Sequence, residues 1–241
     1  MTTYQSNSPD NQSWKPIQKP AEIVESQLIV GILDGTFPAN SHLPAERVLA
    51  ESLGVTRPTL REALQRLTRD GWVEIHHGKP TRVRDYLTEG NLGVLNALAE
   101  HSDFSPQNFV PNLLSVRLAM APMYAKLAVE NAPTELLAFL ERRVALDDSP
   151  RAFADFDWSL HHTLTILSGN PIFVLILNGF KDLYLNLAPV YFTIPDARQT
   201  SRFFYDELAK ATKTNDTLKA KSLTESIMHD SLTYWRQTHI D

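Results

Sequence analysis

The segment from Leu43 to Val83 limits the possible folds of this chain most strongly, because it combines helix start and stop signals with a local excess of basic residues. Gly54 ends a first helix, and Thr56 can accept a hydrogen bond from the unpaired N–H groups that begin the next one. From Leu60 onward, leucine and alanine recur at i, i+3, i+4 and i+7, which forms one apolar stripe. Gly71 suits a left-handed helix end. The pattern predicts two short helices joined by a tight turn.

A hairpin is expected directly after the second helix. The sequences WVEIHH and TRVRDY alternate as strands do, and they flank a tip made of His77, Gly78, Lys79 and Pro80. An apolar helix that begins near Pro20 would cover the two short helices from behind. We interpret residues 20–85 as a winged helix-turn-helix domain that binds DNA.

The charge of this segment supports the same interpretation. Between Arg57 and Arg84 there are seven basic and three acidic residues, whereas the whole chain has a net charge of −5. A basic island on an acidic protein is typical of one module that neutralises phosphates. The alternative, a solvated helix face with ordinary basic residues, does not account for the cap, the apolar stripe and the hairpin.

The rest of the chain has helical periodicity and predicts an all-helical domain. A length of 241 residues leaves room for two domains. Residues 1–19 resemble a flexible N-terminal arm, residues 86–91 a linker, and residues 92–241 a helical regulatory domain. The helix start and stop signals of this domain predict a bundle of about seven helices, near residues 92–99, 106–130, 133–146, 150–168, 171–187, 195–212 and 216–238. The expected fold class is therefore mainly α.

Composition excludes several functions. The absence of cysteine rules out disulfides and thiolate metal sites. The longest apolar run, Ile172 to Leu177, is too short to cross a bilayer, and the first residues lack a signal peptide, so we expect a cytoplasmic protein without membrane contact. With no glycine cluster, no Ser-His-Asp order and no nucleophilic cysteine, we expect no enzyme activity.

Several motifs resemble a known family. LPAERVLAESLGVTRPTLREALQRLTRDGW is similar to the winged-helix signature of GntR-family bacterial transcription regulators. The chain also resembles one subfamily of that family, the fatty-acid-responsive FadR type, over about residues 20–236. The motifs that carry this resemblance are DGWVEIHHGKPTRV, NLLSVR, SGNPIFVLILNGFKDLY and HDSLTYW. The resemblance implies a homodimer that binds a palindromic operator in double-stranded DNA and leaves it on binding long-chain fatty acyl-CoA. It also implies repression of fatty acid degradation genes and activation of synthesis genes.

The resemblance further implies DNA contacts by seven residues: Arg47, Thr56, Arg57, Thr59, Arg61, His77 and Gly78. Arg57 and Arg61 are one helical turn apart, so both can enter one groove, where arginine pairs with guanine O6 and N7. Threonine hydroxyls suit phosphate oxygens. The subfamily usually has threonine where this chain has Pro58, which fits the first helical turn but removes a hydroxyl contact.

For acyl-CoA, the resemblance implies contacts by Arg117, Asp230, Ser231 and Trp235. We also expect an apolar lining that includes Phe180, Tyr184, Tyr191 and Tyr205. Asp230 is an odd partner for a polyanion and could instead hold Arg117 in position. A lysine that the subfamily can use for the CoA phosphates is replaced by Ile240, and Lys181 or Arg236 could substitute for it.

A metal site is the competing interpretation of the helical domain. Many relatives with such a domain hold a divalent ion through an Asp, a His four residues later and two further His. The matching residues are Asp157, His161, Asp206 and His229. A regulator that senses a small carboxylate through this metal is therefore the alternative function. We favour buried polar residues bonded to each other, and expect no metal or other cofactor.

Overall fold

The computed structural model describes residues 19–104, 106 and 108–238, and the chain divides into two compact units between Glu89 and Gly90. This division lies inside the segment 86–91. Apart from Lys19, the arm expected over residues 1–19 lies outside the described residues, as does Ile240.

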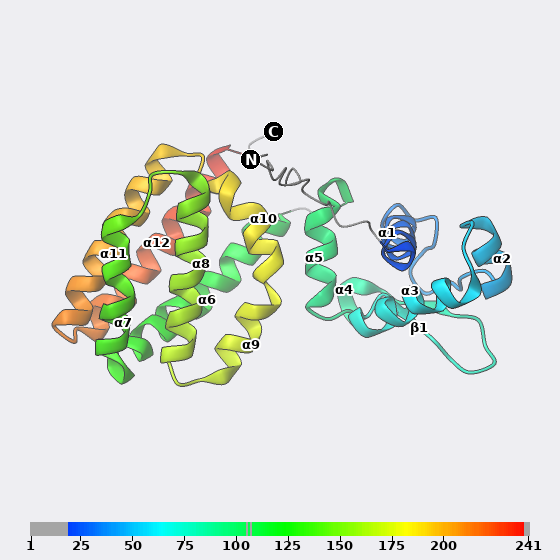
Figure 1. Cartoon of the computed structure of the whole chain (residues 1–241), viewed down its shortest axis with the longest axis horizontal. Coiled ribbons are helices and arrows are strands. Elements are labelled where there is room, and N and C mark those ends of the chain that lie inside the picture. The colour runs from blue at the N-terminus through cyan, green and yellow to red at the C-terminus, as the bar shows by residue number, and fades with distance from the viewer. Residues whose placement is uncertain (1–18, 105, 107, 239–241) are drawn as a thin grey trace, which may run out of the picture. The chain divides into compact units, whose positions relative to one another are not determined.

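The first unit is a small helical domain with a hairpin (Figure 1). Its elements are α1 (Pro20–Leu33), α2 (Glu46–Ser52), α3 (Arg57–Asp70), β1 (Val73–Glu74), β2 (Arg82–Val83) and α4 (Tyr86–Glu89). Helices α1 and α2 both pack against α3. The core contains Leu28 of α1, Leu60 and Leu67 of α3, and Trp72, all of them at most 1% exposed. The predicted winged helix-turn-helix is confirmed.

Helix α3 begins and ends where the sequence predicts. The Oγ1 atom of Thr56 accepts a hydrogen bond from the backbone N–H of Thr59, and Pro58 occupies the first turn. At the other end, Gly71 has φ +91°, a left-handed conformation that glycine adopts without a steric penalty. The apolar stripe that includes Leu64 is buried. These local signals position the polar face of α3 away from the core.

The hairpin is shorter than its alternating sequence predicts. In the antiparallel sheet Val73 is opposite Val83 and Glu74 is opposite Arg82, and an isolated bridge joins His42 to Arg82. Residues 75–80 are all exposed, so no packing favours continued strand pairing there. The hairpin is therefore a short paired base with a long exposed tip.

The second unit is a helical bundle. Its helices are α5 (Gly93–Glu100), α6 (Phe109–Asn131), α7 (Pro133–Leu140), α8 (Pro150–Leu167), α9 (Pro171–Gly179), α10 (Lys181–Tyr191), α11 (Pro195–Lys213) and α12 (Thr217–Thr238), with short 3₁₀ turns at Ser102–Phe104 and Glu141–Ala145. Helix α6 packs against both α12 and α8, and α11 packs against α12 and α7 (Figure 1). The mainly helical fold class is confirmed.

The helix predicted over residues 171–187 is two helices. It breaks after Gly179, and α9 and α10 meet at an angle of 67°. A Cβ atom on Gly179 would lie 2.7 Å from Cδ1 of Leu92, so Leu92 packs closely against this glycine, a residue that also has a low helix propensity. The helix predicted over residues 133–146 similarly ends at Leu140 and continues as a 3₁₀ turn.

Among the described residues, no single helix is both long and apolar enough to cross a membrane. Helices α9 and α10 reach that length and composition together, but with the bend between them.

Candidate nucleic-acid interface and pocket

The exposed face of α3 carries two arginines that share one carboxylate. Arg61 donates from Nε to Oε2 of Glu46 at 2.8 Å, and Arg57 donates from Nη2 to the same oxygen at 3.4 Å. Glu46 is the first residue of α2. The side chains of Arg57 and Arg61 are 55% and 58% exposed. Two guanidinium groups therefore stand together on an accessible surface of the first unit.

The other predicted DNA contacts are exposed or half-buried in the same unit. The hydroxyls of Thr56 and Thr59 are 2.9 Å apart at the start of α3. Arg47 lies on α2 and bonds to Glu51 at 2.9 Å. His77 and Gly78 form the exposed tip of the hairpin, where Gly78 has φ +73°.

Two later arginines of α3 pair with neighbouring acids. Arg66 bonds to Glu62 and Arg69 to Asp70, both at 2.8 Å. Both lie in the later part of α3, and Arg66 is only 26% exposed, whereas Arg57 and Arg61 are more than half exposed near the start of the helix. Arg57 and Arg61 are therefore the better candidates for base contact.

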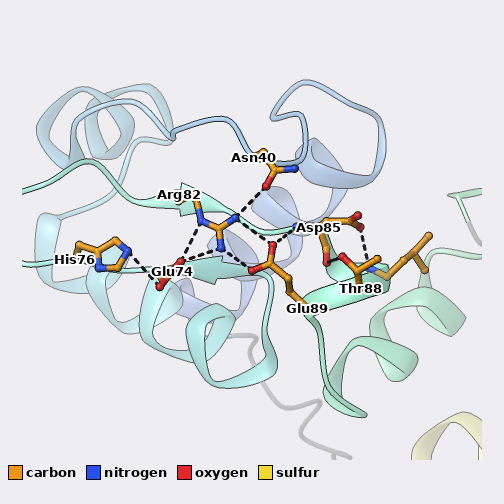
Figure 2. Close-up of polar contacts among 8 residues, drawn as sticks. Asn40, Glu74, His76, Arg82, Asp85, Thr88 and Glu89 are labelled. Atoms are coloured by element: carbon orange, nitrogen blue, oxygen red, sulfur yellow. Dashed lines mark hydrogen bonds and ion pairs between the residues drawn. The ribbon is translucent and has the colours of Figure 1, made fainter.

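The base of the hairpin is held by an ionic cluster around Arg82 (Figure 2). The sequence indicated only that Arg82 adds to the basic charge of this segment. Arg82 of β2 donates to Glu74 of β1 at 2.9 and 3.0 Å, to Glu89 of α4 at 2.6 and 3.1 Å, and to Asn40 at 3.0 Å. Hydrogen bonds from Arg82 hold the pKa of both carboxyls below the usual range. The pairing of Glu74 with Arg82 could have been predicted from the hairpin, because oppositely charged residues directly across two strands attract each other.

The second unit contains one large apolar pocket among the described residues, between α6, α8, α10, α11 and α12. Its empty space is about 760 Å³, including solvent at the mouth. The lining residues are Val110, Leu113, Leu114, Arg117, Asp157, Phe180, Leu183, Tyr184, Leu187, Ala188, Tyr191, Phe192, Ser201, Ile227, Met228, Ser231 and Trp235. A mostly apolar lining with a few polar side chains is typical of a site for a small organic ligand.

Most of the predicted acyl-CoA contacts come together in this pocket. Six of the eight line it: Arg117, Phe180, Tyr184, Tyr191, Ser231 and Trp235. Tyr205 is fully buried behind the wall, and Asp230 is half-buried on α12 without being part of the lining. The hydroxyl of Tyr191 donates to Oγ of Ser231 at 3.3 Å, which links α10 to α12 across the pocket wall.

Polar groups gather around Asp157 at one side of the pocket. Tyr184 and Tyr205 donate their hydroxyls to its two carboxylate oxygens, and Nη2 of Arg117 lies 3.4 Å from Oδ2. Burial would raise the pKa of the Asp157 carboxyl, but His161, Arg117 and the two tyrosine hydroxyls together hold it below its usual value. The Asp157 carboxylate is therefore charged at neutral pH. It is Asp157 that pairs with Arg117, the role that was expected of Asp230.

The four candidate metal ligands do not form one site. His161 is 1% exposed, its Nδ1 lies 2.7 Å from the hydroxyl of Tyr124, and burial lowers its pKa to about 4, so it is neutral at neutral pH. On α11 the buried residue is Tyr205, and the adjacent Asp206 points away from the core. Asp206 pairs there with Arg143 at 2.8 Å. His229 is exposed on α12.

In the part of the chain that the structure describes, no group of three or more His, Cys, Asp or Glu side chains is arranged to hold a metal ion. The metal-sensing alternative is therefore not supported. The sequence indicates that Asp157 and His161 are close together, but not that they lie beside Arg117 at the apolar pocket. The i, i+4 spacing on α8 was a correct signal of contact and not of metal binding.

A winged helix-turn-helix unit with exposed arginines on α3, together with a helical bundle that contains an apolar pocket, is the arrangement expected of a DNA-binding regulator. Comparison with known proteins agrees. Residues 20–83 match the model for bacterial regulatory proteins of the gntR family, and residues 84–241 match the model for the FadR C-terminal domain.

Relatives named as fatty acid metabolism regulator proteins match most of the chain. One from Shewanella sp. (strain MR-4) is 42% identical over 225 residues, which cover 92% of both chains. Another from Shewanella halifaxensis (strain HAW-EB4) is 45% identical over 189 residues, 78% of this chain and 79% of the relative. A solved structure of Lar from Listeria monocytogenes is similar in fold, with a TM-score of 0.54 and 18% identity over 92% of this chain and 99% of Lar.

The chain therefore belongs to the GntR family of bacterial transcription regulators, in the FadR-type group whose members are named for fatty acid metabolism. It is a regulator that acts by binding, and not an enzyme.

Proposed function

We propose that this protein is a homodimeric regulator of fatty acid metabolism whose operator binding is released by long-chain fatty acyl-CoA. In this role it represses degradation genes and activates synthesis genes in the bacterial cytoplasm. The observation that carries the proposal is the pocket of the helical bundle, whose lining is mostly apolar and includes Arg117, Tyr191, Ser231 and Trp235.

An alkyl chain fits the chemistry of this lining. Leucine, phenylalanine and other apolar side chains from α6, α10 and α12 face the pocket. Each methylene transferred from water into such a site contributes roughly 0.8 kcal/mol. Four further methylenes that remain inside the pocket would therefore strengthen binding by about a hundredfold once ordering costs are deducted.

The polar side of the pocket offers donors for the thioester end. Nε of Arg117 is buried and has no hydrogen-bond partner among the described residues, so it can donate to a carbonyl oxygen. Lys181 and Arg236 are exposed, and each directly follows a lining residue in the sequence. We propose these two cations for the CoA phosphates, and the hydroxyl of Ser231 for a contact nearer the thioester.

On the DNA side, we propose that Arg57 and Arg61 read guanines in the major groove, while Arg47, Thr56 and Thr59 contact phosphates. The exposed tip with His77 and Gly78 would approach the adjacent minor groove. A two-fold symmetric operator would be read by a homodimer, with one α3 in each half-site.

A titration with acyl-CoAs of graded length tests the proposal. The operator duplex is first selected from a randomised pool by the wild-type protein, and its complex is followed by fluorescence anisotropy. We expect release that becomes more efficient as the chain lengthens. Leu187→Trp fills the pocket and should require more acyl-CoA, whereas Leu218→Trp, at a side chain that is 71% exposed, should behave as wild type.

Failure of every acyl-CoA to release the duplex at saturation would contradict the proposal. Equal release by CoA without an acyl chain would show that the pocket does not carry the response.

A further inference from the structure

Glu46 occupies an unexpected position for an acidic residue, because it lies between the two arginines best placed to enter a DNA groove. Its Oε2 atom accepts from Nε of Arg61 at 2.8 Å and from Nη2 of Arg57 at 3.4 Å. Phosphates repel a carboxylate, so its presence weakens the general attraction to DNA. This inference rests on the proposed DNA-binding role of α3.

The geometry of the contacts indicates what the carboxylate does. Arg61 is held through Nε, the nitrogen nearest its own helix, so the two terminal nitrogens stay at the outer end of the side chain. Those two nitrogens can pair with O6 and N7 of one guanine. A long side chain that is held in one orientation loses less entropy when it pairs. One carboxylate on α2 thus contacts two guanidinium groups on α3.

The charges of the cluster support a role in selectivity. Two arginines and one glutamate leave a net charge of +1, which retains attraction to the duplex while reducing it for any sequence. Specificity is a difference between two affinities, and it increases when the affinity for wrong sequences decreases. The 32% exposure of the Glu46 side chain shows that it is not a core residue whose loss would disrupt packing.

We propose that Glu46 is a specificity-determining residue of this regulator, which orients Arg57 and Arg61 for guanine and lowers affinity for random DNA. It acts through the arginines and makes no base contact of its own.

Glu46→Gln in the full-length protein tests the inference, with Glu62→Gln as the matched control. Both changes remove one negative charge that bonds to an arginine in the same unit, but Glu62 bonds to Arg66, which is not a proposed base contact. Each variant is titrated with the wild-type-selected duplex and with a random duplex. Each protein also repeats the selection from the randomised pool.

For Glu46→Gln we expect random DNA to bind about two- to threefold tighter, from loss of a charge near phosphates. The ratio of selected to random affinity should decrease by about tenfold or more, since oriented guanine pairs supply discrimination of that size. The pool selected by this variant should lose preference at guanine positions. Glu62→Gln should keep the wild-type ratio.

An unchanged ratio and unchanged pool for Glu46→Gln would overturn the inference while leaving the proposed function intact. An equal decrease for Glu62→Gln would also overturn it, because a general charge effect would then be sufficient. A wild-type protein that enriches no sequence would overturn the proposed DNA-binding role itself, and with it this inference.

Discussion

The buried pair of Arg117 and Asp157 predicts a large stability effect. Asp157→Asn keeps the shape of the side chain but removes its charge, and leaves the guanidinium of Arg117 without a counterion. The side chains of Arg117 and Asp157 are only 18% and 10% exposed, so water cannot fully replace the lost partner. Breaking a buried ion pair in this way costs about 3–5 kcal/mol, and the remaining exposure of Arg117 favours the lower end.

The magnitude can be measured by urea unfolding. A loss of about 3 kcal/mol with a slope of roughly 2 kcal/mol per molar urea lowers the unfolding midpoint by about 1.5 M. The control is the double variant Arg117→Met with Asp157→Asn, which removes both charges and should recover most of the loss. If the effect of Arg117 and Asp157 comes from their charges, the double variant should be more stable than Asp157→Asn alone.

The pH dependence gives an independent check. The folded-state pKa of Asp157 lies below its ordinary value, so the stabilisation is complete above about pH 4 and is lost as the pH falls through the folded pKa. The difference between wild type and Asp157→Asn should be constant around neutral pH and shrink only in acid. A loss below 1 kcal/mol at pH 7, or a double variant less stable than the single one, would refute the reasoning.

Three further predictions follow from single residues. Because burial lowers the pKa of His161 to about 4, the unfolded state binds more protons between about pH 6.5 and 4; stability should fall with decreasing pH there, by up to about 1.4 kcal/mol per unit, and His161→Phe should reduce that slope in urea titrations. Ser231→Asn enlarges a buried pocket residue beside Tyr191, so gel shifts should show the operator complex persisting at acyl-CoA concentrations that release wild type. Arg61→Ala should weaken binding to the selected duplex by about 1–3 kcal/mol with a much smaller effect on random DNA; equal losses would indicate a phosphate contact.

The sequence predicted the parts of the fold that depend on local signals. Thr56 and Gly71 fix the ends of α3 by hydrogen bonding and backbone conformation, which neighbouring residues alone determine. The break after Gly179 was missed because a single glycine inside an apolar run is compatible with a continuous helix, and the neighbouring Leu92 comes from a distant part of the sequence. Glycine inside an apolar run gives no indication of which side chain will approach it.

The sequence predicted several of the residues that line the pocket, but not which of them pair with each other. Resemblance to the family named Arg117, Ser231 and Trp235, which the structure brings to one pocket. It did not predict that Asp157 would be the partner of Arg117, since the two lie forty residues apart on different helices. Spacing along α8 showed that Asp157 is near His161 but could not reveal which third element packs against both.

The cluster around Arg82 has a consequence for measurements in salt. The hairpin is attached by the buried side chains of Val73 and Val83 and by backbone hydrogen bonds, and the part-exposed ion pairs of Arg82 add to this attachment. Dissolved ions weaken such attractions as well as the attraction between protein and duplex. The slope of binding against ionic strength would then contain an intramolecular contribution, and counting phosphates from that slope would overestimate how many the protein contacts.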